Sequence, residues 1–413
     1  MRTSVTPKIE FSLASEADDA EIRRLLRNNP MAGQISLSLE REPEYFTEAR
    51  HSGVEQQTIV ARDRGRIVCV GTCSFRQRFV NGKPRRVGYL GGLRLDARLG
   101  GRFDILRRGY RFFHELQLAN PADFYFTAIA SDNERARQFL ERGLPGMPRY
   151  DYLGDFVTML IPVPRNRRHE EADSAMAVRP SRTGSGVRPS PGAEMWPAAE
   201  AQELSVAVDS SNVAAPGDGR TPGTDEYEPI AALLEAHHCR YQFAPCWPAE
   251  ELKAIQPLGL RLEDFCIANN QGKPVACAAL WDQRTFKQTV IRGYARPLAW
   301  ARPWVNFAAR LRRRPGLPAV GSTLPHAPVS HLVVPAERPE MVSNLVRSVL
   351  SLAQLKGIEW LTLGFAVADP RLAALRRWFA GREYHSRLYR VRWPDVPGDA
   401  FDDRLPYPEV ALL

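Results

Sequence analysis

The chain has 413 residues, of which 44% are hydrophobic and 25% are charged, and its formal net charge is +9. These fractions are ordinary for a globular protein and exclude collagen-like, wholly disordered and disulfide-scaffold architectures. No apolar run approaches the ~20 residues of a membrane-spanning helix, and the first residues lack the apolar core of a signal peptide. The sequence therefore predicts a cytoplasmic protein without a membrane partner. Domains usually run to about 100–200 residues, so we expect two or three.

The positive charge is spread along the chain rather than gathered in one motif. Six of the 56 basic residues are Lys and the rest are Arg, which is typical of an Arg-rich coding bias. No aromatic and basic motif accompanies the charge, so the sequence argues against a nucleic-acid partner and leaves an anionic small molecule open. The six cysteines show no C-x-x-C spacing, so we expect buried, reduced thiols and no metal site.

Composition divides the chain into three segments. Residues 1–162 and 225–413 alternate strand-like and helix-like patterns, whereas residues 163–224 are dominated by Pro, Gly, Ser, Ala and mixed charge. The middle segment cannot recover its ordering entropy by burial, so we expect a flexible linker. The sequence predicts a mixed α/β (α+β) fold of two domains, each with a mixed, mostly antiparallel sheet flanked by helices.

The order of elements in the first segment is largely repeated in the second. The first should hold a strand at 8–15, helices at 16–29 and 40–53, a hairpin at 56–79, a strand at 85–96, a helix at 101–119 and a strand at 122–130. The second should hold a helix at 226–241, a hairpin at 264–291, a strand, turn and helix at 331–357, and a strand, loop and helix at 358–379. This parallel indicates duplication.

Two further pieces of the second segment stand out. Residues 293–325 form a Trp- and Pro-rich insertion without a counterpart in the first segment, and we expect its aromatic side chains to pack between the domains. Residues 407–413, YPEVALL, are apolar enough to dock on a partner surface.

A strand runs directly into a helix at residues 93–106. Gly100 and Gly101 lie in the turn between the two elements and allow a ligand to approach the backbone closely. The free N–H groups and the dipole of a helix start favour a pyrophosphate at this point. Arg98 and Arg102 add positive charge beside it. On these residues alone, a plain tight turn is the alternative.

At this junction the sequence resembles the GNAT (N-acetyltransferase) superfamily, whose acyl-CoA signature is [R/Q]-x-x-G-x-[G/A]. Arg98 and Gly101 match the first two fixed positions, whereas Phe103 replaces the small third residue. The segment after the next strand also resembles the family, through Asn133, Ala136, Phe139 and Gly143. The resemblance covers about residues 10–160 and implies tandem GNAT-like domains, of which the second is degenerate.

The resemblance implies an acyl-CoA co-substrate, which we expect to be acetyl-CoA, held where two central parallel strands split. Pantetheine would follow the strand backbone, the pyrophosphate would bind the turn, and an amine would attack the thioester directly. The cofactor-binding residues implied are Leu93, Leu95, Arg98, Leu99, Gly100, Gly101, Arg102, Phe103 and Asn133. No metal is implied.

Catalytic residues are less clearly marked. Many family members have a Tyr after the position of Phe139, where this chain has Leu140, and the strand before the signature carries no carboxylate. Tyr89 is the best polar candidate on that strand, and Tyr150 on a later strand is a candidate acid. Packed aromatic side chains are the alternative interpretation of both. Glu42 and Tyr45 lie where, by the resemblance, variable helices cover the acceptor, so they are the candidate substrate contacts; a solvated helix face is the alternative interpretation.

The second segment should not bind CoA. Its strand-to-helix junction has no Gly, and Pro335 and Pro339 remove N–H donors that a phosphate site needs. Asp369 occupies the place of Asn133, and its negative charge disfavours an anionic ligand. We therefore expect this half to serve as a scaffold or to close the acceptor site.

The leading hypothesis is an acyl-CoA-dependent N-acyltransferase, an acetyltransferase, acting on a small-molecule or peptide amine. A non-catalytic tandem GNAT-like protein that binds a ligand or partner is the alternative, favoured by the missing Tyr, the missing carboxylate and Phe103. A third possibility resembles the tandem GNAT-like enzymes of cell-wall synthesis, which transfer aminoacyl groups from charged transfer RNA. The CoA-type turn argues against that third interpretation.

Overall fold

The computed structural model describes residues 9–31, 33–99, 101–164, 223–393 and 399–413. Most of the predicted linker, and Gly100, lie outside these ranges. The strands are β1 (Glu10–Leu13), β2 (Ile35–Glu40), β3 (Glu55–Asp63), β4 (Arg66–Val80), β5 (Lys83–Leu95), β6 (Phe124–Ala130), β7 (Arg149–Pro162), β8 (Phe265–Asn270), β9 (Lys273–Leu280), β10 (Gln288–Tyr294), β11 (His326–Val333), β12 (Trp360–Ala366) and β13 (Arg382–Arg392). The helices are α1 (Asp19–Asn28), α2 (Thr47–Ser52), α3 (Phe103–Gln117), α4 (Glu134–Leu140), α6 (Glu228–His238), α7 (Ala249–Ala254), α8 (Arg296–Leu311), α9 (Met341–Leu355) and α10 (Pro370–Trp378). Short 3-10 turns include η2 (Ala97–Leu99), η4 (Gln256–Leu258) and η6 (Val410–Leu412).

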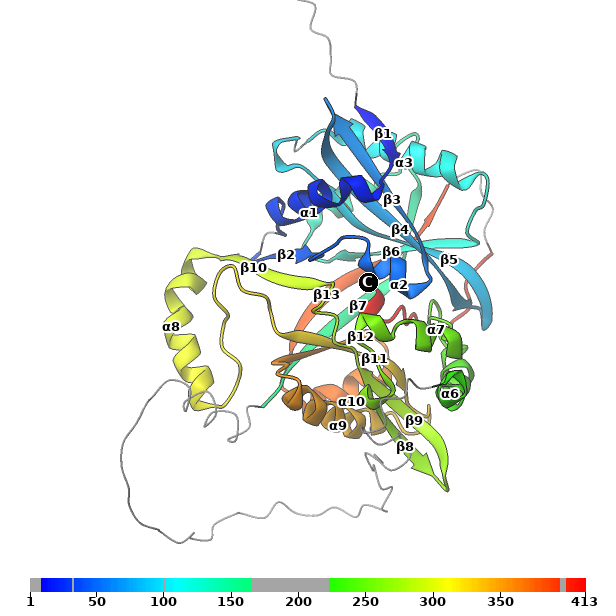
Figure 1. Ribbon diagram of the computed structural model, residues 1–413, viewed down its shortest axis with the longest axis vertical. Coiled ribbons are helices and arrows are strands. Elements are labelled where there is room, and N and C mark those ends of the chain that lie inside the picture. Colours follow the sequence, from blue (N-terminus) through cyan, green and yellow to red (C-terminus); the bar gives the residue numbers. More distant parts are fainter. Residues whose placement is uncertain (1–8, 32, 100, 165–222, 394–398) are drawn as a thin grey trace, which may run out of the picture.

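Within the described ranges, eleven strands form one sheet in the order β1-β3-β4-β5-β6-β13-β7-β12-β11-β9-β8 (Figure 1). The pairs β5–β6 and β11–β12 are parallel and the other neighbours are antiparallel. Strands β2 and β10 form a separate antiparallel pair. The prediction of a mixed, mostly antiparallel sheet flanked by helices is confirmed.

The centre of the sheet is built from strands of both halves of the chain. Strand β13 lies between β6 and β7, and β7 lies between β13 and β12. Phe156 of β7 pairs with Ser386 of β13 on one side and with Ala366 of β12 on the other. Ser386 in turn pairs with Ala130 of β6. This agrees with the repeated order of elements in the sequence. The proposed division into domains at 1–162 and 225–413 stays a prediction, because the two segments share one sheet.

Helices α1 and α3 cover opposite faces of the first half. Ile22 and Leu25, at positions i and i+3 of α1, are buried against Val60 of β3. Ile105 of α3 is buried against Ala61, the next residue of the same strand, whose side chain points to the other face. Helix α2 contacts α7 and η4, so the helices on the α1 side meet those of the second half. None of the described helices is both long and apolar enough to span a bilayer.

The expectation that the aromatic side chains of residues 293–325 pack between domains is wrong for helix α8, although Gly293 and Tyr294 of the same insertion pair with β2 of the first half. Helix α8 lies at the outer edge of the molecule beyond β10 (Figure 1), where Trp300 and Trp304 are 85% and 77% exposed. The opposite face of α8 is tied down, because the Asn306 side chain and the Leu317 backbone exchange hydrogen bonds of 2.6 and 3.1 Å. Helical spacing places the two Trp side chains on one face, but it does not tell which face meets the core.

Candidate functional site

The two central strands of the first half run together and then separate. Strands β5 and β6 pair in parallel from Val87–Phe124 to Tyr89–Phe126. One residue further, the Thr127 hydroxyl donates a 2.7 Å hydrogen bond to the Leu90 carbonyl. Beyond that point β5 bulges away from its pairing with β4, through Gly92 at φ +62°. Gly92 and Leu93 are exposed, so the backbone at this split is accessible from solvent.

Tyr89 stands at the closed end of the split. Its ring packs on Phe126 with centroids 5.1 Å apart, and a Cβ added to Gly91 would lie 2.8 Å from the Tyr89 ring. Glycine at position 91 therefore makes room for this ring. Burial raises the pKa of Tyr89 to about 12, so the hydroxyl stays protonated at neutral pH. It can donate a proton there but cannot act as a base.

Arg94 follows the Gly92 bulge and lies within electrostatic range of both Tyr89 and Tyr384; sequence reasoning missed Arg94 and Tyr384. Burial lowers the pKa of Arg94, while Tyr89 and Tyr384 interact favourably with its charge. Tyr384 is 43% exposed and belongs to β13. No local pattern could bring Tyr384 here, because the position of β13 between β6 and β7 depends on long-range strand pairing.

The turn between β5 and α3 has the predicted open backbone. Gly101 has φ +99°, and a Cβ added there would meet nothing within 4 Å. The Arg98 guanidinium donates two hydrogen bonds, of 3.1 and 2.9 Å, to the Asp96 carboxylate. The Arg102 guanidinium donates two, both of 2.8 Å, to the Asp104 carboxylate. Both Arg side chains are exposed, so these pairs are weak and can exchange for a phosphate.

Most N–H groups of the described part of this turn already donate within the chain: those of Arg98 and Phe103 donate to the Asp96 carboxylate at 3.0 Å and to the Gly101 carbonyl at 2.9 Å. The Leu99 N–H donates to the Asp96 carbonyl at 2.8 Å, and the Arg102 N–H donates to the Leu99 carbonyl at 3.0 Å. A pyrophosphate bound here would therefore rely on the exposed Arg side chains and on the approach that Gly101 leaves open.

Three other predicted CoA contacts flank the split. Phe103, the first residue of α3, is 39% exposed and stacks on Phe139 with centroids 4.5 Å apart. This stacking accounts for a large residue where the family signature has a small one. Asn133 caps α4, since its side-chain oxygen accepts from the Ala136 N–H at 3.2 Å. Leu95 is partly buried in the cluster beneath α3.

Tyr89 and Tyr150 are not brought together. The Tyr150 hydroxyl lies 2.6 Å from that of Tyr110 on α3, and burial raises the pKa of Tyr150 well above its ordinary value. Tyr150 packs near Tyr125 of β6, whereas Tyr89 packs on Phe126, the next residue, whose side chain points to the other face. The two candidate catalytic residues therefore lie on opposite faces of the sheet.

The two predicted substrate contacts are engaged within the chain. The Glu42 carboxylate accepts hydrogen bonds from Arg23 and Arg27 of α1. Tyr45 is 5% exposed, and its N–H donates to Asp19 at 2.6 Å. The structure places both against α1.

A partly buried charge cluster lies on the Tyr89 side of the sheet and was also missed. Glu48 of α2 pairs with Arg41. Burial raises the pKa of Glu48, but Arg41 and Lys287 outweigh it and hold the value at about 2. Burial lowers the pKa of Lys287 to about 8. Lys287 lies more than 200 residues after Arg41 and Glu48 in the sequence, so no motif marks the cluster.

The Lys287 side chain contacts the last residues of the sequence. Its Nζ donates to the backbone oxygens of Ala411 at 3.3 Å and Leu413 at 3.1 Å. Leu413 packs in the cluster that contains Tyr89 and Phe126. Leu413 therefore contacts Lys287 through its backbone oxygen and packs on the same cluster as the candidate catalytic Tyr89.

The second half has the same split, but the chain itself fills it. Strands β11 and β12 pair in parallel over three residues, and β11 then bulges through His331 at φ +52°. The Glu409 carboxylate accepts from the His331 N–H at 2.5 Å and from Trp247 at 3.0 Å. Val410 lies against Gly364 of β12, where an added Cβ would be 3.0 Å from it. The segment expected to dock on a partner therefore packs within the chain.

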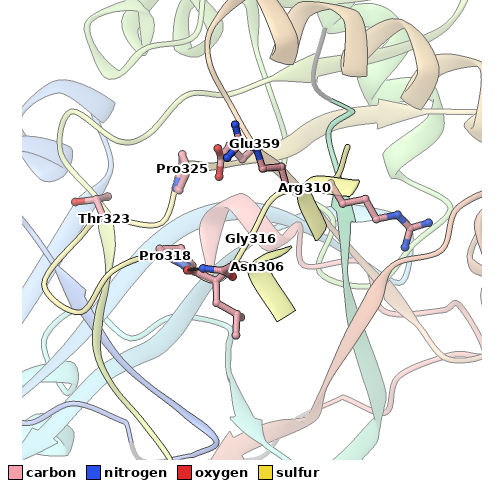
Figure 2. A pocket seen from close by; sticks show the side chains of 9 residues that line it. Asn306, Arg310, Gly316, Pro318, Thr323, Pro325 and Glu359 are labelled. Carbon is pink, nitrogen blue, oxygen red and sulfur yellow. Dashed lines mark hydrogen bonds between the residues drawn. The ribbon is translucent and has the colours of Figure 1, made fainter. Parts of the chain in front are cut away.

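A separate hollow of about 410 Å³ lies beneath α8 (Figure 2). Asn306 and Arg310 of α8 line it together with Pro325 and Glu359, near the closed end of the β11–β12 split. It is therefore away from the candidate site. All six cysteines were expected to be buried; four are, whereas Cys239 and Cys246 are partly exposed. Among the described residues no group of three His, Cys, Asp or Glu side chains could hold a metal ion.

Comparison with solved structures shows the fold. N-myristoyltransferase of Saccharomyces cerevisiae with bound myristoyl-CoA aligns over 98% of this chain and 89% of its own, at 10% identity and a TM-score of 0.54. A second structure of that enzyme with myristoyl-CoA aligns over 95% and 82%, at 10% identity and a TM-score of 0.55. A GCN5-related N-acetyltransferase from Kribbella flavida aligns over 94% and 72%, at 11% identity and a TM-score of 0.41. No protein-family model and no curated protein matches the chain. The chain has a GNAT-like fold.

Proposed function

We propose that this chain is an acyl-CoA-dependent N-acyltransferase whose acyl donor binds the β5–β6 split. The observation that carries this proposal is the contrast between the two splits. The split of the first half exposes Gly92 and Leu93, whereas Glu409 and Val410 occupy that of the second. The turn around Gly101 follows the open split, and the exposed side chains of Arg98 and Arg102 beside it would meet the phosphates of CoA.

The bulge at Gly92 would hold the thioester oxygen. In the second half the equivalent bulge residue, His331, donates its N–H to a carboxylate oxygen of Glu409. A backbone N–H in this conformation therefore binds a carboxyl oxygen. By analogy, the N–H groups of the Gly92 bulge would stabilise the oxyanion that forms as an amine attacks the thioester carbonyl.

Tyr89 would act as the general acid and Lys287 as the general base. The amine nitrogen forms the new C–N bond, the C–S bond breaks, and the products are an amide and free CoA. Lys287 in its neutral form would accept the proton that the amine loses, by way of water, because a pKa of about 8 leaves part of it neutral near pH 7. Tyr89 stays protonated and would supply a proton to the departing thiolate.

The donor proposed is acetyl-CoA. Phe126 stacks on Phe243 at 4.8 Å beside Tyr89, and Leu413 packs in the same cluster. Side chains therefore occupy the space next to the candidate hydroxyl, which favours a short acyl group. The acceptor proposed is a small-molecule or peptide amine approaching from the Tyr89 face.

The test follows CoA release with acetyl-, octanoyl- and myristoyl-CoA across amine and peptide acceptors. We expect turnover to be fastest with acetyl-CoA and to be lost in the Tyr89→Phe variant. Faster turnover with myristoyl-CoA would overturn the short-chain assignment but retain acyl transfer. Binding of acyl-CoA without turnover of any acceptor would instead favour the ligand-binding alternative.

A further inference from the structure

Helix α8 presents a continuous apolar face to solvent. Trp300, Trp304, Phe307 and Leu311 are spaced four, three and four residues apart, so their side chains share one face of the helix. Their exposed fractions are 85%, 77%, 66% and 79%. Single exposed apolar residues are normal on a protein surface, but a contiguous group of this kind marks an interaction surface. We call these four residues the α8 stripe.

The stripe is held facing outward by the inner face of the same helix. Asn306 exchanges hydrogen bonds with the Leu317 backbone, and Arg302 donates to the Leu317 carbonyl at 3.2 Å. The Tyr294 hydroxyl donates to the Pro318 carbonyl at 2.7 Å. These contacts fix the loop after α8 against its inner face, so turning the stripe inward would break them.

The surroundings of the stripe carry positive charge. Residues 293–325 contain six Arg and neither Asp nor Glu. Arg296, Arg310 and the run at 312–314 are exposed. Arg310 and Arg314 also line the hollow beneath the helix, and Figure 2 shows Arg310, Asn306 and Pro318 among its lining side chains. An occupant of this surface must combine an apolar layer with negative charge.

We propose that α8 docks the protein on the surface of an anionic lipid bilayer. Trp, Phe and Leu on one face of a helix that is rich in Arg are the combination that lies in the plane of the headgroups, with aromatic rings at the boundary of the acyl chains. The Arg side chains would meet the lipid phosphates. This docking is peripheral and runs against the sequence-based prediction of no membrane partner, which rested on the lack of an apolar run long enough to span a bilayer. It does not depend on the proposed acyl transfer.

The test uses the full chain and vesicles of phosphatidylcholine with or without phosphatidylglycerol. We expect co-sedimentation with the anionic vesicles, weakening as salt is added, together with a blue shift of Trp fluorescence. The double variant Trp300→Ser, Trp304→Ser should lose about tenfold or more in partitioning, because it removes both exposed indoles. Both side chains are largely solvent-exposed, so the variant should keep the wild-type unfolding temperature.

Matched controls separate the stripe from general surface properties. Trp378 on α10 is 61% exposed, and Trp378→Ser should bind vesicles like the wild type. The charge variant Arg312→Gln, Arg313→Gln should weaken binding, whereas Arg142→Gln, Arg377→Gln, with the same net charge, should do so less. Equal binding by the wild type and the double Trp variant would overturn the proposal, as would binding to neither kind of vesicle. A wild-type dimer that the double Trp variant converts to monomer would instead assign the stripe to a second copy of the chain.

Discussion

Gly92 and His331 occupy equivalent points in the two halves of the sheet. Each has a positive φ, +62° and +52°, at the bulge where a strand leaves its parallel partner. The His331 N–H is bound by the buried Glu409 carboxylate, whereas Gly92 is exposed. One backbone arrangement is therefore closed by the chain's own residues in the second half and open in the first. We expect one acyl-CoA site per chain.

Calorimetric titration of the full chain with acetyl-CoA should give one equivalent bound. Gly101→Glu should abolish this binding, because it places a side chain and a negative charge where the backbone is open to the phosphates. Gly272→Glu is the control, since Gly272 also has a positive φ, +78°, with open space around it, but lies in the β8–β9 turn. Both variants carry the backbone cost of a side chain at positive φ, about 1–2 kcal/mol. Two equivalents bound, or unchanged affinity in Gly101→Glu, would place the phosphates elsewhere.

Replacing Tyr89 and Tyr150 by Phe should separate catalysis from packing. Tyr89→Phe keeps the ring against Phe126 but removes the proton donor, so kcat should fall about 10²- to 10³-fold with little change in stability. Tyr150→Phe removes the hydrogen bond to Tyr110 and should cost about 1 kcal/mol of stability at nearly unchanged kcat. CoA release and urea unfolding measure the two effects. A larger loss of kcat in Tyr150→Phe would reverse the assignment.

Local patterns predicted the strand, turn and helix around Gly101 because alternation, a Gly-containing turn and an amphipathic helix are all encoded within about thirty residues. The other contacts at the site join residues that lie far apart in the sequence. Tyr384 comes near Arg94 through the insertion of β13, and Lys287 contacts Leu413, which is 126 residues away in the sequence. Such pairings depend on long-range sheet order, which no local spacing reveals. The spacing of the α8 stripe was visible in the sequence, but amphipathic periodicity does not tell whether the apolar face is buried.

The rate of acyl transfer should follow the titration of Lys287. A general base must be neutral, and burial lowers the pKa of Lys287 to about 8, so kcat/KM should rise with pH until about pH 8 and then level. In Lys287→Met this limb should disappear when the same acceptor amine is used, and the rate should fall. Lys273→Met, at an exposed position in the second half, should keep the wild-type profile. An unchanged limb in Lys287→Met would assign the ionisation to the acceptor itself.

The Glu48 carboxylate should make the free energy of unfolding depend on pH in the acidic range. Its pKa of about 2 in the folded chain lies below the ordinary value of 4.5, because Arg41 and Lys287 outweigh the effect of burial. The favourable contribution is therefore fully present above about pH 4.5 and is lost as the pH falls toward 2. Glu48→Gln should lower the free energy of unfolding by about 2–3 kcal/mol at pH 7 and by much less at pH 3. Glu44→Gln, whose partner Arg50 is exposed, should change stability by less than about 1 kcal/mol at either pH. Urea unfolding at the two pH values measures the difference, and an equal loss for Glu48→Gln at pH 3 and pH 7 would show that packing, not charge, sets its contribution.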